Sequence, residues 1–373
     1  MVKTILKFIP ALAILIGTIV GAGFLGIPYV VSKSGFIPGL LVILFVFLFI
    51  LTIKLYLGEI VLRTKGNLQL VGYAEKYTGE IGKFLMFFAT IFGIYSALIA
   101  YIIAEGESLS YLIFGNFNYS FIFSCFFWLI MCYLTFIGLK ALKKYEKISM
   151  FLVIILFLII FINYVKSIKL ENLMYVNKEN FFLPFGVILF SFLGFSAIPE
   201  VNRVMHGKEN YIKDVIIIGT LVPFILYSIF SFVLLGNFAE NINEIATLSL
   251  NRIYSSLAVL TLFTAYFSLS IAIRDMFRFD LKLGRMKGWI FSSFVPFIIF
   301  LLFYIFKIDS FIKILGIGGV ISGGLTGILI LFMNYNAKKN SERKPEYELK
   351  INKFIIFLFS LIFLIGTILE LLK

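Results

Sequence analysis

Charged residues, cysteine and histidine are all scarce in this sequence of 373 residues. Asp, Glu, Lys and Arg make up 14% of the chain, about half their share in an ordinary soluble domain. The two cysteines, Cys125 and Cys132, share one apolar segment, and the single histidine, His206, lies in a polar loop. This arrangement supports neither a disulfide nor a metal cluster. The sequence also lacks a nucleophile–base set and a phosphate loop, so we expect no enzyme and no cofactor.

Apolar residues are abundant instead. They form 61% of the chain, with 46 phenylalanines and 19 tyrosines. This much apolar surface cannot be hidden inside one water-soluble core, so most of it must face lipid. The first apolar stretch is rich in glycine and has no small-residue cleavage site after it, so we expect a retained span rather than a signal peptide.

Eleven segments are long and apolar enough to cross a bilayer, which takes about 20 mainly apolar residues in helical form. No polar stretch between them is long enough for a soluble domain. We therefore predict an all-α integral membrane protein. The predicted spans cover residues 5–31, 36–62, 83–112, 119–139, 147–166, 181–205, 212–236, 253–278, 287–306, 308–335 and 352–372.

The net charge of +13 is distributed unevenly between the two sides of the membrane. When the spans alternate, 24 of the 33 lysines and arginines fall on the side of the N-terminus and 8 on the other, with Lys54 inside a span. Cytoplasmic loops carry such an excess. We predict a protein of the cell membrane with a cytoplasmic N-terminus and an external C-terminus. The same placement explains the basic charge without a nucleic-acid partner.

The first ten spans divide into two sets of five. Because five is odd, the second set begins on the opposite side of the membrane from the first, as in transporters built from inverted repeats. We predict a transporter core over residues 1–335, with repeats over about 1–170 and 175–335. Residues 336–373 form a cytoplasmic linker and an eleventh helix.

The first span of each set carries a signal for a break in the helix. Span one has four glycines between Gly17 and Gly26, followed by Pro28. Each glycine in a helix costs about 1 kcal/mol relative to alanine. Span six has Gly194 between serines, with Pro199 five residues later. An alternative for span one is a small-residue packing face through Gly17 and Gly21, but this leaves the break in span six unexplained.

Breaks at this depth predict a binding site. Lipid offers no partners to freed backbone groups, so such backbone is tolerated where it lines a polar cavity. The N-terminal end of a half-helix suits a carboxylate. The C-terminal end of the other half presents carbonyl groups, which suit an ammonium group or a sodium ion. A zwitterionic amino acid matches both ends.

The motif from Gly17 to Tyr29, read GTIVGAGFLGIPY, resembles the opening of the amino-acid/auxin permease and aromatic amino-acid permease families. These belong to the amino acid–polyamine–organocation superfamily. Residues 183–199, 217–227 and 264–275 are similar to their sixth, seventh and eighth helices, so the likeness covers residues 1 to about 335. It implies the leucine-transporter-type fold, with two inverted five-helix repeats and an appended eleventh helix.

The resemblance also implies a substrate site at the two breaks. Backbone N–H groups near Gly21 would bind the substrate carboxylate. Carbonyl groups around Gly194 would bind its ammonium group. Phe190 would be an aromatic gate, and Ser196 would stand where relatives place a selectivity-setting side chain. The N–H donors would be Ala22, Gly23 and Phe24, and the carbonyl acceptors Val20, Ser191 and Leu193.

The coupling ion stays open between a proton and sodium. Some proton-coupled relatives carry a lysine deep in helix five. When this sequence is aligned with theirs, Val153 occupies that position, so this coupling residue is absent. Sodium-coupled relatives use hydroxyl groups of helix eight facing helix-one carbonyls such as those of Gly17 and Val20. Thr264 and Ser268, four residues apart, offer such hydroxyls, although a hydroxyl on a membrane helix often bonds its own backbone.

Other ionisable groups inside the spans are functional candidates by default. Glu200 follows Pro199 and could titrate a proton or gate the inner side; its alternative is an intrahelical ion pair with Arg203. Lys54 is expected to extend its amine to the membrane surface. Glu105 and Glu107 are expected to lie at a solvated helix end near the external end of span three; the alternative is a role in an outer vestibule.

Together these features predict a secondary active permease that works by alternating access. Its substrates are expected to be amino acids with apolar or aromatic side chains. The alternatives are a channel, a transporter of another small organic solute or amine, and a membrane enzyme acting on lipid. A channel would need a continuous polar stripe along its helices. A membrane enzyme would need clustered histidine or aspartate within the spans. The spans show neither feature. The sequence leaves open which amino acid is carried, whether transport is exchange, and the oligomeric state.

Overall fold

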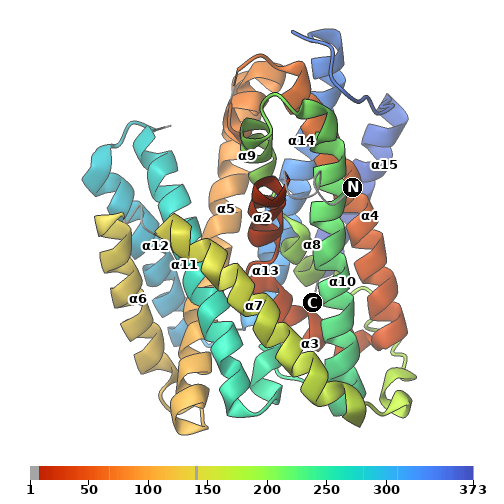
Figure 1. Ribbon diagram of the computed structural model, residues 1–373. Coiled ribbons are helices and arrows are strands. Elements are labelled where there is room, and N and C mark those ends of the chain that lie inside the picture. The colour runs from red at the N-terminus through yellow and green to blue at the C-terminus, as the bar shows by residue number, and fades with distance from the viewer. Residues whose placement is uncertain (1–7, 67, 139–141, 280, 309, 373) are drawn as a thin grey trace.

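The computed structural model describes residues 8–66, 68–138, 142–279, 281–308 and 310–372, and these residues form helices and connecting segments without a strand (Figure 1). The longer helices are α2 (Ile9–Ile19), α3 (Ile27–Ser34), α4 (Phe36–Arg63), α5 (Leu70–Phe114), α6 (Ser120–Ile137), α7 (Leu142–Tyr164), α8 (Phe185–Phe192), α9 (Ala197–Val204), α10 (Ile212–Phe238), α11 (Ser255–Phe279), α12 (Gly284–Ile305), α13 (Phe311–Gly318), α14 (Gly324–Lys339) and α15 (Lys353–Leu371). The short ones are η1 (Ala22–Gly26), η2 (Val165–Ser167), η3 (Leu170–Leu173), η4 (Glu209–Tyr211), η5 (Ala246–Ser249), η6 (Arg252–Tyr254) and the π-helix η7 (Gly319–Gly323).

Ten of the eleven predicted spans are present among the described residues. Nine segments are long and apolar enough to cross a membrane, and a tenth is the pair formed by residues 9–19 and 22–34, which is bent by 45°. The fifth predicted span, 147–166, lies in α7, where the side chains of residues 142–152 are outside the described set. The third predicted span begins after a kink in α5 at Gly79, whose φ is 73°.

Both predicted breaks are confirmed. Helix α2 ends at Ile19, and an extended Gly21 (ψ −153°) leads into the short helix η1. Helix α8 ends at Phe192, and α9 starts only at Ala197. Between them Gly194 adopts φ +98°, which residues with a side chain rarely adopt. Glycine therefore fixes the place of the second break.

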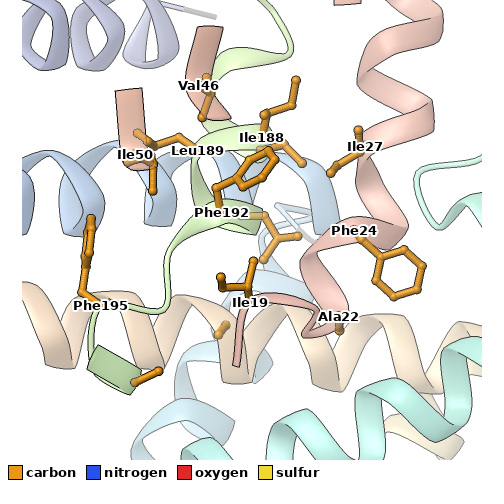
Figure 2. Close-up of a cluster of buried hydrophobic side chains, with 14 of the residues drawn as sticks. Ile19, Ala22, Phe24, Ile27, Val46, Ile50, Ile188, Leu189, Phe192 and Phe195 are labelled. Atoms are coloured by element: carbon orange, nitrogen blue, oxygen red, sulfur yellow. The ribbon is translucent and has the colours of Figure 1, made fainter. Parts of the chain in front are cut away.

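The two broken spans cross at the centre of the bundle. Helix α2 packs against α9 and α10, and η1 packs against α8. In Figure 2, Ile19 from the first break lies just below Phe192 from the second, with Phe24 to one side and Phe195 to the other. Apolar side chains thus surround two short stretches of irregular backbone and keep them away from lipid.

The segment 340–352 ties the eleventh helix to the core. It runs past the end of α4, where the fully buried Glu59 accepts hydrogen bonds from Arg63 (2.9 Å) and from the backbone N–H of Leu349 (3.0 Å). Arg63 in turn contacts Glu348 at 2.8 Å. A buried carboxylate is thereby paired with a cation and a backbone donor, which offsets the cost of its burial.

Two ionisable side chains differ from the sequence-based expectation. Lys54 does not reach the membrane surface, since it is 0% exposed, and Glu105 is not at a solvated end, since it is 1% exposed. Neither the Lys54 amine nor the Glu105 Oε2 atom has a hydrogen-bond partner among the described residues. Helix packing, which the sequence pattern does not report, encloses both.

The Glu59 pairing predicts a large loss of stability when the carboxylate is removed. Glu59→Ala removes one of the two carboxylates that Arg63 contacts and leaves the N–H of Leu349 without this acceptor; breaking such a buried pair costs about 3–5 kcal/mol. The matched control is Glu75→Ala, because Glu75 pairs with Lys83 at the surface and exposed pairs contribute about 0–1 kcal/mol. Thermal unfolding in detergent compares the two; equal losses would contradict the role of burial at Glu59.

Candidate substrate site

The first break presents backbone donors. Ala22, Gly23 and Phe24 open η1, and the first N–H groups of a short helix have no acceptor within it. The hydroxyl of Tyr101, from α5, lies beside them, 3.5 Å from the position of a Cβ added to Gly21. The predicted carboxylate-binding groups therefore lie together, and a tyrosine hydroxyl lies close to them.

The carbonyl ends of both breaks are joined by one side chain. The hydroxyl of Tyr227, from α10, donates to the carbonyl oxygens of Ile19 and Ser191, both at 3.0 Å. Tyr227 is 1% exposed, so water does not compete for these bonds. Two carbonyls freed on different helices therefore depend on one buried hydroxyl.

The two broken helices touch where the sequence predicted a cavity between them. A Cβ added to Gly23 would lie 2.8 Å from Ser191 Oγ and 3.0 Å from Phe190 Cδ1. A Cβ on Gly194 would lie 3.0 Å from Ile19 Cγ1. A side chain at Gly23 would crowd α8, and one at Gly194 would also be strained by the φ of +98°, so glycine suits both contacts.

Exposure is asymmetric about the breaks. The residues on the side where α2 begins are open, since Gly17, Thr18 and Ser196 are exposed, as is Glu200. On the other side of the first break, residues 22–28 are buried. Of the predicted substrate-binding residues, Ala22, Gly23, Phe24 and Ser191 are buried, Val20, Gly21, Phe190, Leu193 and Gly194 are half-buried, and Ser196 is exposed.

The candidate ion-coupling groups lie farther apart in the structure than the groups at the two breaks. Thr264 and Ser268 lie half-buried on α11, which packs against η1. The Thr264 hydroxyl donates to the carbonyl of Leu260 (2.9 Å) on its own helix. Among the described residues, no ion pair links Glu200 to Arg203. A sodium site on α11 and a role for Glu200 stay predictions.

Tyr101 and Tyr227 were not among the predicted site residues. A signal for them was present, because a tyrosine in the middle of an apolar span needs a partner for its hydroxyl. Freed backbone at the breaks is the main supply of such partners at this depth. Which tyrosine reaches which break depends on helix packing.

Residues 4–251, more than half of the chain, match the model of the tryptophan/tyrosine permease family. The chain belongs to this family. The permease is also 23% identical to Glutamine transporter 2 of Aliivibrio fischeri, over 92% of this chain and 93% of that protein. It is 24% identical to Tyrosine-specific transport system 1 of Haemophilus influenzae, over 91% and 90%. These findings place it among transporters rather than enzymes.

The fold of the permease matches a solved structure. The crystal structure of MhsT in complex with L-phenylalanine superposes with a TM-score of 0.65 and 17% identity, over 97% of each chain. The permease therefore has the leucine-transporter-type fold predicted from the sequence, with two inverted five-helix repeats and α15 as the added helix.

The Gly23 contact predicts that two substitutions will differ in effect. Gly23→Val places branched carbons against Ser191 and Phe190 and should abolish amino-acid binding, since it blocks the donors of η1. Phe190→Ala removes contact area only and should weaken binding. The affinities should differ by more than about tenfold, or 1.4 kcal/mol. Binding is measured by ligand-induced thermal stabilisation of purified protein; normal affinity in Gly23→Val would move the carboxylate site elsewhere.

Proposed function

We propose that this permease carries amino acids, aromatic ones foremost, by alternating access driven by an ion gradient. The observation that carries the proposal is the meeting of two half-helix ends at Tyr227, next to the N–H groups of η1. A carboxylate suits those N–H groups, and an ammonium group suits carbonyls such as that of Ser191. A zwitterion with both groups fits between them.

The aromatic preference rests on the rings around the breaks. Phe24 is buried and stacks on Tyr227 with ring centroids 6.4 Å apart, and Phe190 lies against Gly23 from the other side. Aromatic pairs stabilise each other beyond their buried area. The family description, the tyrosine transport relative and the phenylalanine in the MhsT structure agree with this preference. The glutamine transporter relative is the reason to test a polar substrate too.

We place the permease in the amino acid–polyamine–organocation superfamily, nearest the amino-acid/auxin and aromatic amino-acid permeases. The helix-one motif from Gly17 to Tyr29 supports this, together with the leucine-transporter-type fold. Residues 1–335 would then be the transport core, and residues 336–373 an addition that the inverted repeats do not require.

The side where α2 begins would be the cytoplasmic side, given the excess of lysine and arginine there. Gly17, Thr18 and Ser196 are exposed on that side, whereas Ala22 to Gly26 are buried on the other. This asymmetry supports an inward-facing conformation. Transport from outside would require η1 and α8 to part on the opposite side.

A ligand panel tests the proposal. Tryptophan, tyrosine and phenylalanine should raise the unfolding temperature, because a ligand that binds only the folded state stabilises it. Tryptamine, which lacks the carboxylate, and indole-3-propionate, which lacks the ammonium group, should not. Stabilisation by tryptamine equal to that by tryptophan would favour an amine transporter.

Uptake by liposomes containing the purified protein separates the remaining classes. A permease shows saturable uptake and accelerates exchange of labelled for unlabelled tryptophan across the membrane. A channel shows neither saturation at low concentration nor acceleration by substrate on the far side. Non-saturable flux would therefore overturn the proposal.

The charge distribution gives a separate prediction of orientation. A cysteine at Lys144, whose side chain lies outside the described residues, should react only with reagents on the cytoplasmic side. A reporter fused after Lys373 should be active outside the cell. Labelling of position 144 from outside intact cells would reverse the assignment.

A further inference from the structure

The eleventh helix, α15, packs on the transport core along one face. It lies at the edge of the bundle, against α14, α8, α13 and η7 (Figure 1). The residues that share this face, three or four positions apart, are Phe363, Gly366, Thr367 and Glu370. Residues on the opposite face, such as Leu364 and Ile368, are exposed and suit lipid. Helix α15 therefore touches the second broken span, through α8, and the tenth span, through α13.

Glu370 extends its carboxyl group between two glycines of these spans. The Oε2 atom lies 2.8 Å from the position of a Cβ added to Gly186 of α8. A Cβ added to Gly316 of α13 would collide with Oε1, and its three nearest atoms all belong to Glu370. The two glycines also face each other, because the Gly186 Cβ would lie 2.9 Å from the Gly316 carbonyl oxygen. Helices α8, α13 and α15 thus meet at one point around the carboxyl group.

This meeting point adjoins the closed side of the permease. A Cβ added to Gly26, at the end of η1, would lie 2.6 Å from Ile312 Cδ1 and 3.2 Å from Val187 Cγ1. Val187 follows Gly186 in α8 and is 0% exposed. The contact between η1, α8 and α13 therefore closes one side of the substrate site, and Glu370 lies next to that contact.

The position of the Glu370 carboxyl group also favours an interaction with α8. A helix carries a partial negative charge at its C-terminal end and a partial positive charge at its N-terminal end. Glu370 is in the last turn of α15, where its own helix disfavours an acid. Gly186 is the second residue of α8, where an acid is favoured. The first turn of α8, rather than α15, thus stabilises the carboxyl group.

We propose that Glu370 is a positioning residue for α8, and that its carboxyl group keeps the external side of the permease closed by holding α8 against α13. The inference rests on the proposed alternating access and gives the eleventh helix a role in it. Opening on the external side moves α8 away from Gly26 and disrupts the contact of Glu370 with Gly186 and Gly316. Removing the carboxyl group therefore shifts the equilibrium toward the outward-open conformation.

Cysteine labelling of the full-length protein in liposomes tests the inference. The reporters are Val187→Cys at the closed contact and Thr18→Cys on the exposed side, with Cys125 and Cys132 replaced by alanine. Glu370→Ala should make labelling at 187 by an external, membrane-impermeant maleimide about two- to fivefold faster, the range for one charge at a helix end. Labelling at 18 from the cytoplasmic side should become slower, because the two sides open alternately. Faster labelling at both positions would mean a loosened protein and would overturn the inference.

Gly316→Ala is a matched variant that acts on the same contact. The added methyl group displaces the carboxyl group of Glu370, so it should speed labelling at 187 as Glu370→Ala does. In the Glu370→Ala background the methyl group enters the vacated space, and Gly316→Ala should add less than about twofold. Two effects that simply multiply would show that the residues act independently and would contradict the contact. Leu364→Ala, on the exposed face of α15, is the control and should label like wild type.

Transport kinetics give a second measurement that a merely structural role would not change. Apparent affinity falls with the fraction of protein in the binding-competent conformation. Glu370→Ala should therefore lower the KM for external tryptophan in exchange by about the same two- to fivefold. A residue that only stabilises α15 would lower the unfolding temperature and leave this KM unchanged. An unchanged KM together with unchanged labelling at 187 would refute the role of Glu370.

The outcomes also separate this inference from the proposed function. A wild-type protein that neither binds nor exchanges aromatic amino acids would overturn the proposed function, while labelling at 187 would still report the effect of Glu370. A wild-type protein that exchanges them, with labelling and KM that do not respond to Glu370→Ala, would keep that function and overturn the inference.

Discussion

The structure depends on how freed backbone groups are satisfied where lipid offers no partners. Interrupting two helices in mid-membrane releases carbonyl and N–H groups, and each one left alone costs several kcal/mol. The Tyr227 hydroxyl serves Ile19 and Ser191 together, and the Tyr101 hydroxyl lies 3.5 Å from the position of a Cβ on Gly21. One tyrosine from an unbroken helix, Tyr227 of α10, thereby links the two breaks.

Glycine makes this arrangement geometrically feasible. Gly194 supplies a left-handed backbone conformation, and Gly23 allows η1 to touch α8. The contact is close enough to exclude a side chain, so it also closes the passage on that side. Opening requires rigid elements to move apart rather than bend, because close-packed interfaces change between discrete arrangements. The exposure of Gly17 and Ser196 on the other side fits such a two-sided closure.

Ionisable groups in the bundle fall into two kinds. Glu59 is buried with Arg63 and the backbone of Leu349, and its charge is compensated, so it stabilises the join between the core and α15. Glu105 is buried too, but in the part of the chain that the structure describes no partner is found for its Oε2 atom. Burying an ionised carboxylate in such surroundings costs much more than burying one paired with a cation. The difference between the two follows from their neighbours and not from their depth alone.

The sequence by itself determined the membrane class, ten of the spans and the places of both breaks, because hydropathy, glycine and proline act locally along the chain. It also identified the residues at the breaks, from Val20 to Phe24 and from Phe190 to Ser196. It did not identify Tyr101 and Tyr227 as their partners, and it placed Lys54 and Glu105 in contact with solvent. Those outcomes depend on which faces of distant helices meet. Only the tertiary structure decided them, since burial and hydrogen-bond partners arise from packing between segments far apart in the chain.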